Sequence, residues 1–228
     1  MSTFVLVHGA YHGGWCWYKV VALLEREGHD VVAVDLPGHG RNAGSKATYA
    51  AYVEHVTKIL RQQAEPVVLV GHSMGGAIVT GVAEAAPETV GKLVYLSAFI
   101  APSGATMEGP LSARAEGDGF IPLEPDGLRL LYQDCSPQDV ALARLCLTTQ
   151  AVEPLTAAVD WTPERWGRIP RLFVGCLQDL AFPLEAQRDR VASVPGTEVV
   201  ELDCGHSPFF SMPEELTRTL LAFAARAG

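Results

Sequence analysis

The sequence predicts an α/β protein: one mostly parallel, doubly wound sheet of about six strands with helices on both faces. Two observations support this prediction. Short apolar runs rich in β-branched residues recur along the chain, and stretches with apolar residues at helical spacing lie between most of them. The runs are apolar without interruption, which is typical of strands buried on both sides, as in parallel sheets. A chain of 228 residues can bury the core of one such domain.

Six segments have the composition of strands, and four segments have the spacing of helices. The predicted strands are Phe4–Val7, Val31–Val34, Val67–Val70, Leu93–Leu96, Leu172–Val174 and Glu198–Leu202. The predicted helices are Trp17–Glu27, Tyr49–Gln63, Ala77–Ala86 and Met212–Ala225. Turn residues mark the helix ends: Gly28 follows the first as a C-cap, Pro87 stops the third, and Pro213 lies in the first turn of the last.

The alternation breaks between residues 101 and 168. This stretch opens with a run rich in glycine and proline, APSGATMEGP, and then has the spacing of two short helices, Leu128–Asp134 and Pro137–Leu147. Open α/β sheets bind ligands beyond the carboxyl ends of their strands, and we expect the stretch to lie there as a small helical cap. The predicted organisation is one domain, with a core of residues 1–100 and 169–228 and a cap insertion of residues 101–168.

Composition and charge exclude several classes of function. The net charge is −9 without a basic cluster, whereas a nucleic-acid binder needs clustered Lys and Arg. No apolar stretch approaches the roughly 18 residues of a membrane span, and the N-terminal residues lack the pattern of a secretory signal. The five cysteines are scattered without a CxxC pair, which argues against a zinc site and a disulfide framework. We therefore predict a cytoplasmic protein that needs no metal or organic cofactor.

The segment VVLVGHSMGG, residues 67–76, joins a predicted strand to the start of a predicted helix. A strand that turns sharply into a helix strains the corner residue, and small neighbours prevent clashes there. Ser73, between Gly71 and Gly75 in G-x-S-x-G spacing, therefore fits a nucleophile elbow. The structural alternative is a serine that only caps the following helix.

A serine hydroxyl becomes a nucleophile when a histidine takes its proton and an acid holds that histidine. Among the seven histidines, His206 follows the last predicted strand in DCGHSPFF and completes the chain order serine, acid, histidine. His12 and His39 also lie in loops after strands and stay open as alternatives. We predict the acid to be Asp179, in the loop CLQDLAFP after the strand RLFVG, although a solvated loop aspartate is its structural alternative. The less favoured carboxylates are Asp35, Asp134, Asp160 and Asp203.

Acyl transfer also needs N–H donors aimed at the developing oxyanion. One is expected to be the amide of Met74, directly after the serine. The other is expected to be the amide of Ala10, in the loop VHGAYHGGW after the first strand. A glycine-rich loop can instead hold a phosphate, but these loops lack both the G-x-G-x-x-G spacing and the lysine of a P-loop. We therefore expect no nucleotide site.

Five segments carry a resemblance to a known family: HGAYHGGWCWYK, GHDVVAVDLPGHG, VVLVGHSMGG, LQDLAFP and CGHSPFFSMPEEL. Together they resemble the α/β-hydrolase superfamily, and more narrowly its branch of plant methylesterases, hydroxynitrile lyases and bacterial esterase relatives. The resemblance runs from Phe4 to the C-terminus and is loosest in the insertion. It implies an α/β-hydrolase fold without the first two strands of larger relatives. It also implies a catalytic triad of Ser73, Asp179 and His206, in agreement with the spacing.

Two positions help to separate the reactions of this branch. The lyases resemble this chain at the triad, but they have a lysine directly after the histidine and tend to have a threonine at the oxyanion position. Here these residues are Ser207 and Ala10, which favours an esterase. The methylesterases often have a methionine in place of Ser207, so the resemblance does not define the substrate.

The predicted function is a serine carboxylic-ester hydrolase that acts on small hydrophobic or aromatic esters through an acyl-enzyme. Two other functions stay open: a hydroxynitrile lyase-like or other cofactor-free C–C bond-cleaving enzyme with the same triad, and a small-ligand binding protein with incidental turnover. The expected partner is the small-molecule ester, with no nucleic acid and no membrane, and the oligomeric state is not defined. Residues expected near the pocket, each an ordinary packing residue under the structural alternative, are His12, Phe99, Leu111, Phe120, Leu131, Tyr132, Leu145, Trp161 and Ser207.

Overall fold

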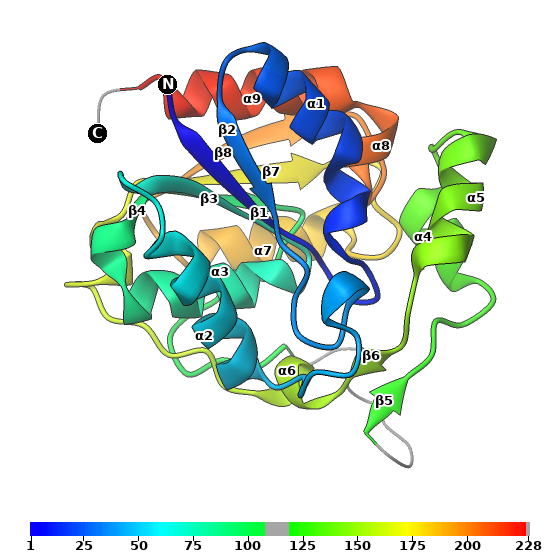
Figure 1. Ribbon diagram of the computed structural model, residues 1–228, viewed down its shortest axis with the longest axis horizontal. Helices are drawn as coiled ribbons and strands as arrows, with labels where there is room; N and C mark the ends of the chain where they lie inside the picture. Colours follow the sequence, from blue (N-terminus) through cyan, green and yellow to red (C-terminus); the bar gives the residue numbers. More distant parts are fainter. Residues whose placement is uncertain (108–118, 227–228) are drawn as a thin grey trace.

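The computed structural model describes residues 1–107 and 119–226, and its main feature is a six-stranded parallel sheet (Figure 1). The strand order is β2-β1-β3-β4-β7-β8, so β2 lies on one side of β1 and all later strands lie on the other. The strands are β1 (Thr3–Val7), β2 (Asp30–Ala33), β3 (Val67–His72), β4 (Val90–Leu96), β7 (Arg171–Cys176) and β8 (Thr197–Leu202). All six predicted strands are confirmed, and β4 separates the strand that leads to Ser73 from the strand that leads to Asp179.

Helices cover both faces of the sheet because strand side chains alternate between two cores (Figure 1). Phe4 and Leu6 of β1 belong to the core beneath α1 and α9, whereas Val5 and Val7 belong to the core beneath α2, α3 and α7. This explains the continuous apolar runs, since both sides of each central strand are buried. The flanking helices are α1 (Tyr18–Arg26), α2 (Tyr49–Leu60), α3 (Gly75–Ala85), α7 (Leu184–Ala192) and α9 (Pro213–Ala224).

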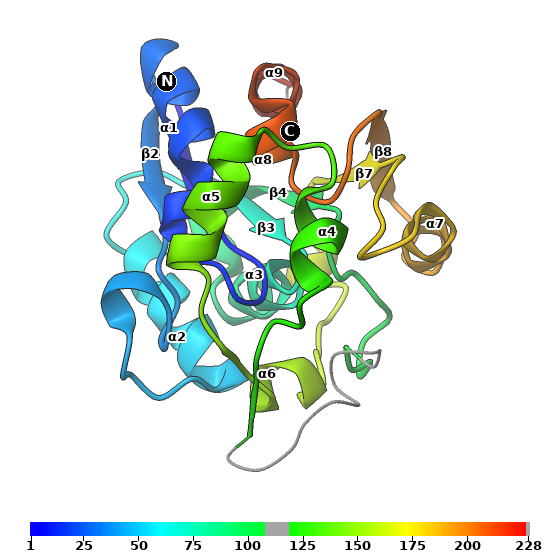
Figure 2. The same ribbon diagram turned by 90° about the vertical axis from the view of Figure 1, so that its right-hand side faces the viewer.

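The segment between β4 and β7, residues 101–168, is termed the insertion segment, and its helices α4 and α5 lie beyond the carboxyl ends of the strands (Figures 1 and 2). Its α4 and α5 confirm the two predicted short helices, and they pack against α8 (Pro208–Ser211). An antiparallel pair, β5 with β6, was not predicted. The elements are β5 (Phe120–Ile121), α4 (Gly127–Tyr132), α5 (Pro137–Cys146), β6 (Gln150–Ala151) and α6 (Glu153–Thr156). The pocket candidate Leu111 lies outside the described residues.

Two core elements differ from the expectation. The run Glu198–Leu202 predicts a buried strand, but β8 is the edge strand of the sheet and leaves Val199 half exposed. The sequence of α7, LEAQRDRVA, is too polar to predict a helix from apolar spacing. Its buried Gln187 instead ties α7 to β7, because the side-chain amide exchanges hydrogen bonds with the backbone of Cys176. That tertiary contact leaves no periodic signal in the sequence.

Short 3₁₀ turns complete the connections: η1 (Gly14–Trp17), η2 (Gly40–Asn42), η3 (Pro87–Thr89) and η5 (Trp166–Arg168). Within residues 1–107 and 119–226, the helices are all too short or too polar to cross a bilayer.

Candidate active site

Ser73 occupies a strained corner between β3 and α3. Its φ is +52°, in the left-handed region that non-glycine residues seldom adopt. Three backbone hydrogen bonds maintain this conformation: Ser73 N donates to Leu96 O at 3.2 Å, and Ser73 O accepts from Gly76 N at 3.1 Å and from Phe99 N at 2.9 Å. The bonds to Leu96, the last residue of β4, and to Phe99 just beyond it hold the corner against its neighbouring strand. The serine is therefore part of a tertiary arrangement, and the N-cap of α3 is the next residue, Met74.

Three glycines let the backbone pack closely around this corner. A Cβ at Gly71 would lie 2.6 Å from Gly75 O, and a Cβ at Gly75 would lie 2.8 Å from Val7 O. A Cβ at Gly9 would lie 2.8 Å from the Cβ of Ser73. Real Cβ atoms do not approach so closely, so each glycine is required by space. Gly9 also shows that the loop after β1 lies directly against Ser73.

Asp179 and His206 form a buried pair just beyond the ends of β7 and β8. His206 Nδ1 donates to Asp179 Oδ2 at 2.6 Å, and the two residues are only 2% and 5% exposed respectively. The other carboxylate oxygen, Oδ1, accepts from the backbone N–H groups of Ala181 and Phe182, both at 2.8 Å. Burial alone would raise the pKa of Asp179, but His206 and the Phe182 N–H together hold the pKa below its ordinary value. The carboxylate is therefore charged at neutral pH.

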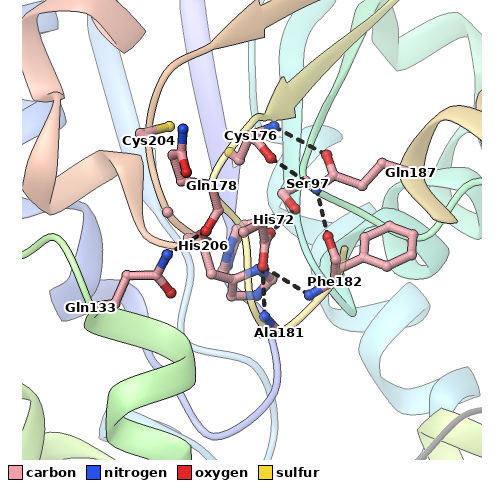
Figure 3. A network of polar contacts seen from close by, with 12 residues as sticks. His72, Ser97, Gln133, Cys176, Gln178, Ala181, Phe182, Gln187, Cys204 and His206 are labelled. Carbon is pink, nitrogen blue, oxygen red and sulfur yellow. Dashed lines mark hydrogen bonds and ion pairs between the residues drawn. The ribbon is translucent and has the colours of Figure 1, made fainter. Parts of the chain in front are cut away.

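Ser97 is a member of this network that the sequence analysis missed. It directly follows β4 with a φ of +38°, and its Oγ donates to Asp179 Oδ2 at 2.5 Å. Figure 3 shows Ser97 beside His206, on the side of Phe182. The sequence signal is weak: a serine directly after a buried strand, which gains meaning only once β4 is known to lie between β3 and β7.

The residue before the serine links the corner to the histidine. His72 Nε2 donates to the carbonyl oxygen of His206 at 2.9 Å, and the two imidazole rings lie 4.7 Å apart between centroids (Figure 3). Burial lowers the pKa of His72 far below its ordinary value, so this ring is neutral. Among the described residues, the Ser73 hydroxyl makes no hydrogen bond to His206. Such bonds often tighten only when substrate binds.

Two backbone amides next to Ser73 have N–H groups without a hydrogen-bond partner among the described residues. Neither Ala10 N nor Met74 N donates a hydrogen bond to another residue in the described ranges. Met74 directly follows Ser73 and immediately precedes the first turn of α3, where helix N–H groups attract negative charge. Ala10 follows Gly9, whose backbone lies against the serine. Both amides are thus available to an anionic atom beside the hydroxyl.

The other two candidate histidines have occupied ring nitrogens. His12 Nδ1 donates to Ala10 O at 2.7 Å, and its Nε2 accepts from Tyr132 Oη at 2.5 Å. Burial lowers the pKa of His12 to about 3, which keeps the ring neutral. His39 contacts Tyr52 Oη at 3.1 Å, and burial lowers its pKa as well. Neither histidine pairs with a carboxylate among the described residues.

Two of the less favoured carboxylates, Asp35 and Asp203, have structural partners. Asp35 accepts from Gly14 N at 2.7 Å and from Arg41 Nε at 2.9 Å, which fits a turn-capping role. Asp203 accepts from the side chain of Gln178 at 2.9 Å. No cluster of metal-ligating side chains occurs in the part of the chain that the structure describes.

The pocket candidates separate into two groups. Phe99 and Tyr132 are buried near the site, where Phe99 N contacts Ser73 O and Tyr132 contacts His12. Ser207 is fully buried next to His206, and its hydroxyl has no partner among the described residues. Leu131 is partly buried in the core beneath α1 and α9.

Three other candidates have surroundings of a different kind. Trp161 stacks on Trp166 with ring centroids 4.3 Å apart and donates to Ala101 O at 2.9 Å, so it packs into the main core. Phe120 in β5 is 49% exposed, and Leu145 in α5 is 86% exposed. As pocket residues these three stay predictions, because apolar character alone does not distinguish a pocket wall from core packing or from an exposed helix face.

Comparisons with known proteins identify the family. A model described as the Alpha/beta hydrolase family matches residues 4–219. Methylesterase 1 from Arabidopsis thaliana is 35% identical, covering 97% of this chain and 95% of the relative. Salicylic acid-binding protein 2 from Nicotiana tabacum is 32% identical, covering 97% and 96%. The crystal structure of polyneuridine aldehyde esterase is similar with a TM-score of 0.85 at 30% identity, covering 98% of this chain and 99% of that chain.

A parallel sheet whose strained serine corner lies beside an Asp–His pair from later strands defines the class of α/β hydrolases. The chain belongs to the alpha/beta hydrolase family, and within it to the branch of the plant methylesterases; it is an esterase-type hydrolase. This chain spans 64% of the length of a longer chloroplastic methylesterase from Arabidopsis thaliana. Because some relatives are named chloroplastic, the cytoplasmic location stays a prediction.

Proposed function

We propose that the protein is a serine carboxylic-ester hydrolase in which Ser73 is the nucleophile, His206 the general base and Asp179 the acid that holds the base. The observation that carries this proposal is the 2.6 Å hydrogen bond between His206 Nδ1 and Asp179 Oδ2, buried beside the strained serine corner. Burial of a charged pair costs free energy, so a role other than stability is expected to account for it. Activation of a nucleophile is such a role.

The hydrogen bond to Asp179 selects the tautomer of His206. A carboxylate only accepts, so Nδ1 carries the proton and Nε2 keeps the lone pair that can take the hydroxyl proton of Ser73. The serine oxygen then bonds to the ester carbonyl carbon, and the carbonyl π electrons move to the oxygen. Asp179 stabilises the resulting imidazolium, and its lowered pKa supports this role.

The amides of Ala10 and Met74 are proposed to stabilise the oxyanion. No hydrogen bond to another described residue has to break first, since both N–H groups are free. The intermediate collapses by breaking the bond to the alcohol, which leaves with the proton from His206. Water then donates a proton to His206 and attacks the acyl-enzyme, and the acid product leaves as Ser73 regains its proton.

The insertion segment is proposed to act as a cap over this site, on a core of residues 1–100 and 169–228. Its helix α4 brings Tyr132 against Phe210 of α8, with ring centroids 5.9 Å apart. Phe99, two residues after Ser97, is also buried, and its backbone N–H donates to Ser73 O. These surroundings support small hydrophobic or aromatic esters as the substrate class.

Two alternatives use the same site differently. The related lyases, which release cyanide, have a cationic residue directly after the histidine. In this chain the corresponding residue, Ser207, is uncharged and fully buried. A binding protein for a small ligand is the other alternative, and salicylic acid-binding protein 2 shows that a relative of this branch is named for binding. The strained serine and the buried Asp179–His206 pair favour catalysis over binding alone, since binding requires neither.

The test is release of p-nitrophenol from short acyl esters, followed by a panel of methyl, aryl and bulky aromatic esters. Ser73→Ala should abolish release and prevent covalent labelling by a fluorophosphonate, whereas Ser193→Ala, at a surface hydroxyl that bonds Arg190 O, should change neither. Tight binding of a small aromatic acid without labelling would favour a binding protein. Cleavage of a hydroxynitrile without ester turnover would favour the lyase.

A further inference from the structure

Three consecutive residues at the end of α4 each bond to a different loop of the candidate active site. They are Tyr132, Gln133 and Asp134, here termed the α4 clamp. Successive residues of a helical turn point about 100° apart, so one helix end can reach three loops that surround it. The reaction steps above use none of these residues.

Asp134 holds the residue that precedes His206. Its Oδ2 accepts from Gly205 N at 2.6 Å, a short charge-assisted hydrogen bond. A Cβ at Gly205 would lie 2.6 Å from Asp134 Oδ1, so the carboxylate rests directly on the backbone at that position. A larger residue at position 205 would collide with Asp134, which explains why glycine is found there. The same contact restricts the backbone next to His206.

Gln133 holds the residue that precedes Asp179. Its side-chain amide donates to the carbonyl oxygen of Gln178, as Figure 3 shows. Gln178 N in turn donates to Cys204 O at 2.9 Å, which joins the Asp179 loop to the loop after β8. Gln133 therefore contacts Gln178, the residue through which the loop of the acid bonds to the loop of the base.

Tyr132 contacts the third loop, which follows β1 and contains Ala10, the proposed oxyanion donor. Its hydroxyl donates to His12 Nε2 at 2.5 Å, and His12 Nδ1 donates to Ala10 O at 2.7 Å. The two bonds require one and the same neutral tautomer of His12. The lowered pKa of this buried ring is consistent with that tautomer. Tyr132 thus orients the Ala10 loop through a histidine that has no free nitrogen.

We propose that the α4 clamp is a set of positioning residues that aligns the His206, Asp179 and Ala10 loops for the reaction assigned above, on which this inference rests. Asp134 has the largest effect of the three, since it acts one residue from the base through a charge-assisted bond. Displacing a reacting group by about 1 Å can cost 10²-fold in rate. Asp134→Ala is therefore expected to lower kcat about 10- to 100-fold with KM nearly unchanged.

Conservative and control variants distinguish positioning from general stability. Asp134→Asn keeps an oxygen that can accept from Gly205 N and should restore most of kcat. Asp126→Ala removes the same charge from the other end of α4, where the side chain makes no capping hydrogen bond, and should leave kcat unchanged. Gln133→Ala, at an exposed position that does not threaten folding, should lower kcat by a smaller factor of about 3 to 10.

A second measurement does not depend on ester turnover. The Nδ1 proton of His206, bonded to Asp179, should give a downfield proton NMR resonance that disappears in His206→Gln. Asp134→Ala should shift or broaden this resonance, and Asp126→Ala should not. Normal kcat and an unshifted resonance in Asp134→Ala would overturn the proposal, as would an Asn variant no better than Ala. If the native protein neither hydrolyses esters nor labels at Ser73, the proposed function has failed, and the resonance alone decides whether the α4 clamp positions His206.

Discussion

The carboxyl edge of the sheet and the insertion segment meet at the candidate site, but they hold their side chains differently. At the sheet edge Asp179 is almost fully buried, and both of its oxygens accept hydrogen bonds from Ser97, Ala181, Phe182 and His206. In the insertion segment Gln133 and Asp134 bond to the core from exposed positions, and Leu145 is mostly exposed. The difference teaches that the sheet edge holds its side chains through buried hydrogen bonds, whereas the insertion segment contacts the core from its surface. Under the proposed mechanism the sheet edge fixes the reacting groups and the insertion segment adjusts them.

The comparison predicts its largest effect at the acid. Asp179→Asn keeps the size of the side chain but allows its amide to donate to His206 Nδ1, which would select the wrong tautomer of the base. We expect kcat for p-nitrophenyl esters to fall roughly 10⁴-fold while the folded structure is retained. Steady-state kinetics and near-UV circular dichroism measure the two quantities. A loss below tenfold would show that Asp179 does not hold the base.

A second large effect is expected at the serine corner. Gly75→Ala would bring a Cβ within 2.8 Å of Val7 O, in backbone that cannot move aside. We expect the free energy of unfolding to fall by about 1–3 kcal/mol, measured by urea denaturation. Gly91→Ala in β4 is the matched control, since its Cβ would make only ordinary contacts of 3.5 Å. Equal effects in the two variants would refute the close-packing explanation.

The neutral histidines of the sheet edge predict a stability that depends on pH. The folded pKa of His12 is about 3, below the ordinary value of 6.5, because the ring is buried. As the pH falls, His12 therefore binds a proton in the unfolded chain before it does so in the folded protein. Its contribution to the free energy of unfolding is fully present above pH 6.5 and is lost progressively as the pH falls toward 3. Each such proton contributes up to about 1.4 kcal/mol per pH unit.

Urea denaturation at several pH values between 7 and 4 tests this dependence. His12→Gln should give a flatter fall in the free energy of unfolding, by about one proton in the pH slope. His8 and His72, whose pKa values are also lowered by burial, should account for much of the remaining slope. An identical slope in the His12 variant would mean that this ring is charged or solvated in the folded protein.

A smaller effect is expected at Ser97. Ser97→Ala removes one of several donors to Asp179 and leaves the His206 bond in place. We expect kcat to fall about tenfold, the effect of one hydrogen bond to a charged group. Steady-state kinetics at saturating ester measure this effect. An unchanged kcat would show that the remaining donors are enough to orient the carboxylate.

The smallest effect is expected in the insertion segment. Leu145→Ser replaces a side chain that is 86% exposed on α5, so little apolar area is lost from a buried environment. The free energy of unfolding should change by less than about 0.5 kcal/mol, and kcat by less than twofold. A large effect on KM for bulky esters would instead place Leu145 at the substrate and would weaken the contrast between the two regions.

The residues that local patterns could predict are those at the ends of strands. Ser73, Asp179 and His206 each follow an apolar run, and a turn motif or the chain order distinguishes each from its competitors. Ser97 follows an apolar run too, but its partner is known only when β4 is placed between β3 and β7. Strand order is a property of the folded sheet, and no periodicity along the chain encodes it.

The aromatic residues of the insertion segment could not be assigned in this way. Tyr132 bonds to His12, Trp161 stacks on Trp166, and Phe120 is half exposed, although all three have similar character in the sequence. Their different roles depend on contacts between segments far apart along the chain. The same is true of α7, where a buried polar contact through Gln187 replaces the apolar face that would predict a helix.

The strand order also divides the reacting groups between two pieces of the chain. A cut between β4 and β7 would leave the serine with the first four main strands, and the carboxylate and imidazole with the last two. Neither fragment alone could turn over substrate under the proposed mechanism, and colour from a chromogenic ester would appear only when the fragments found each other. Fused to two interacting proteins, such fragments would report their association.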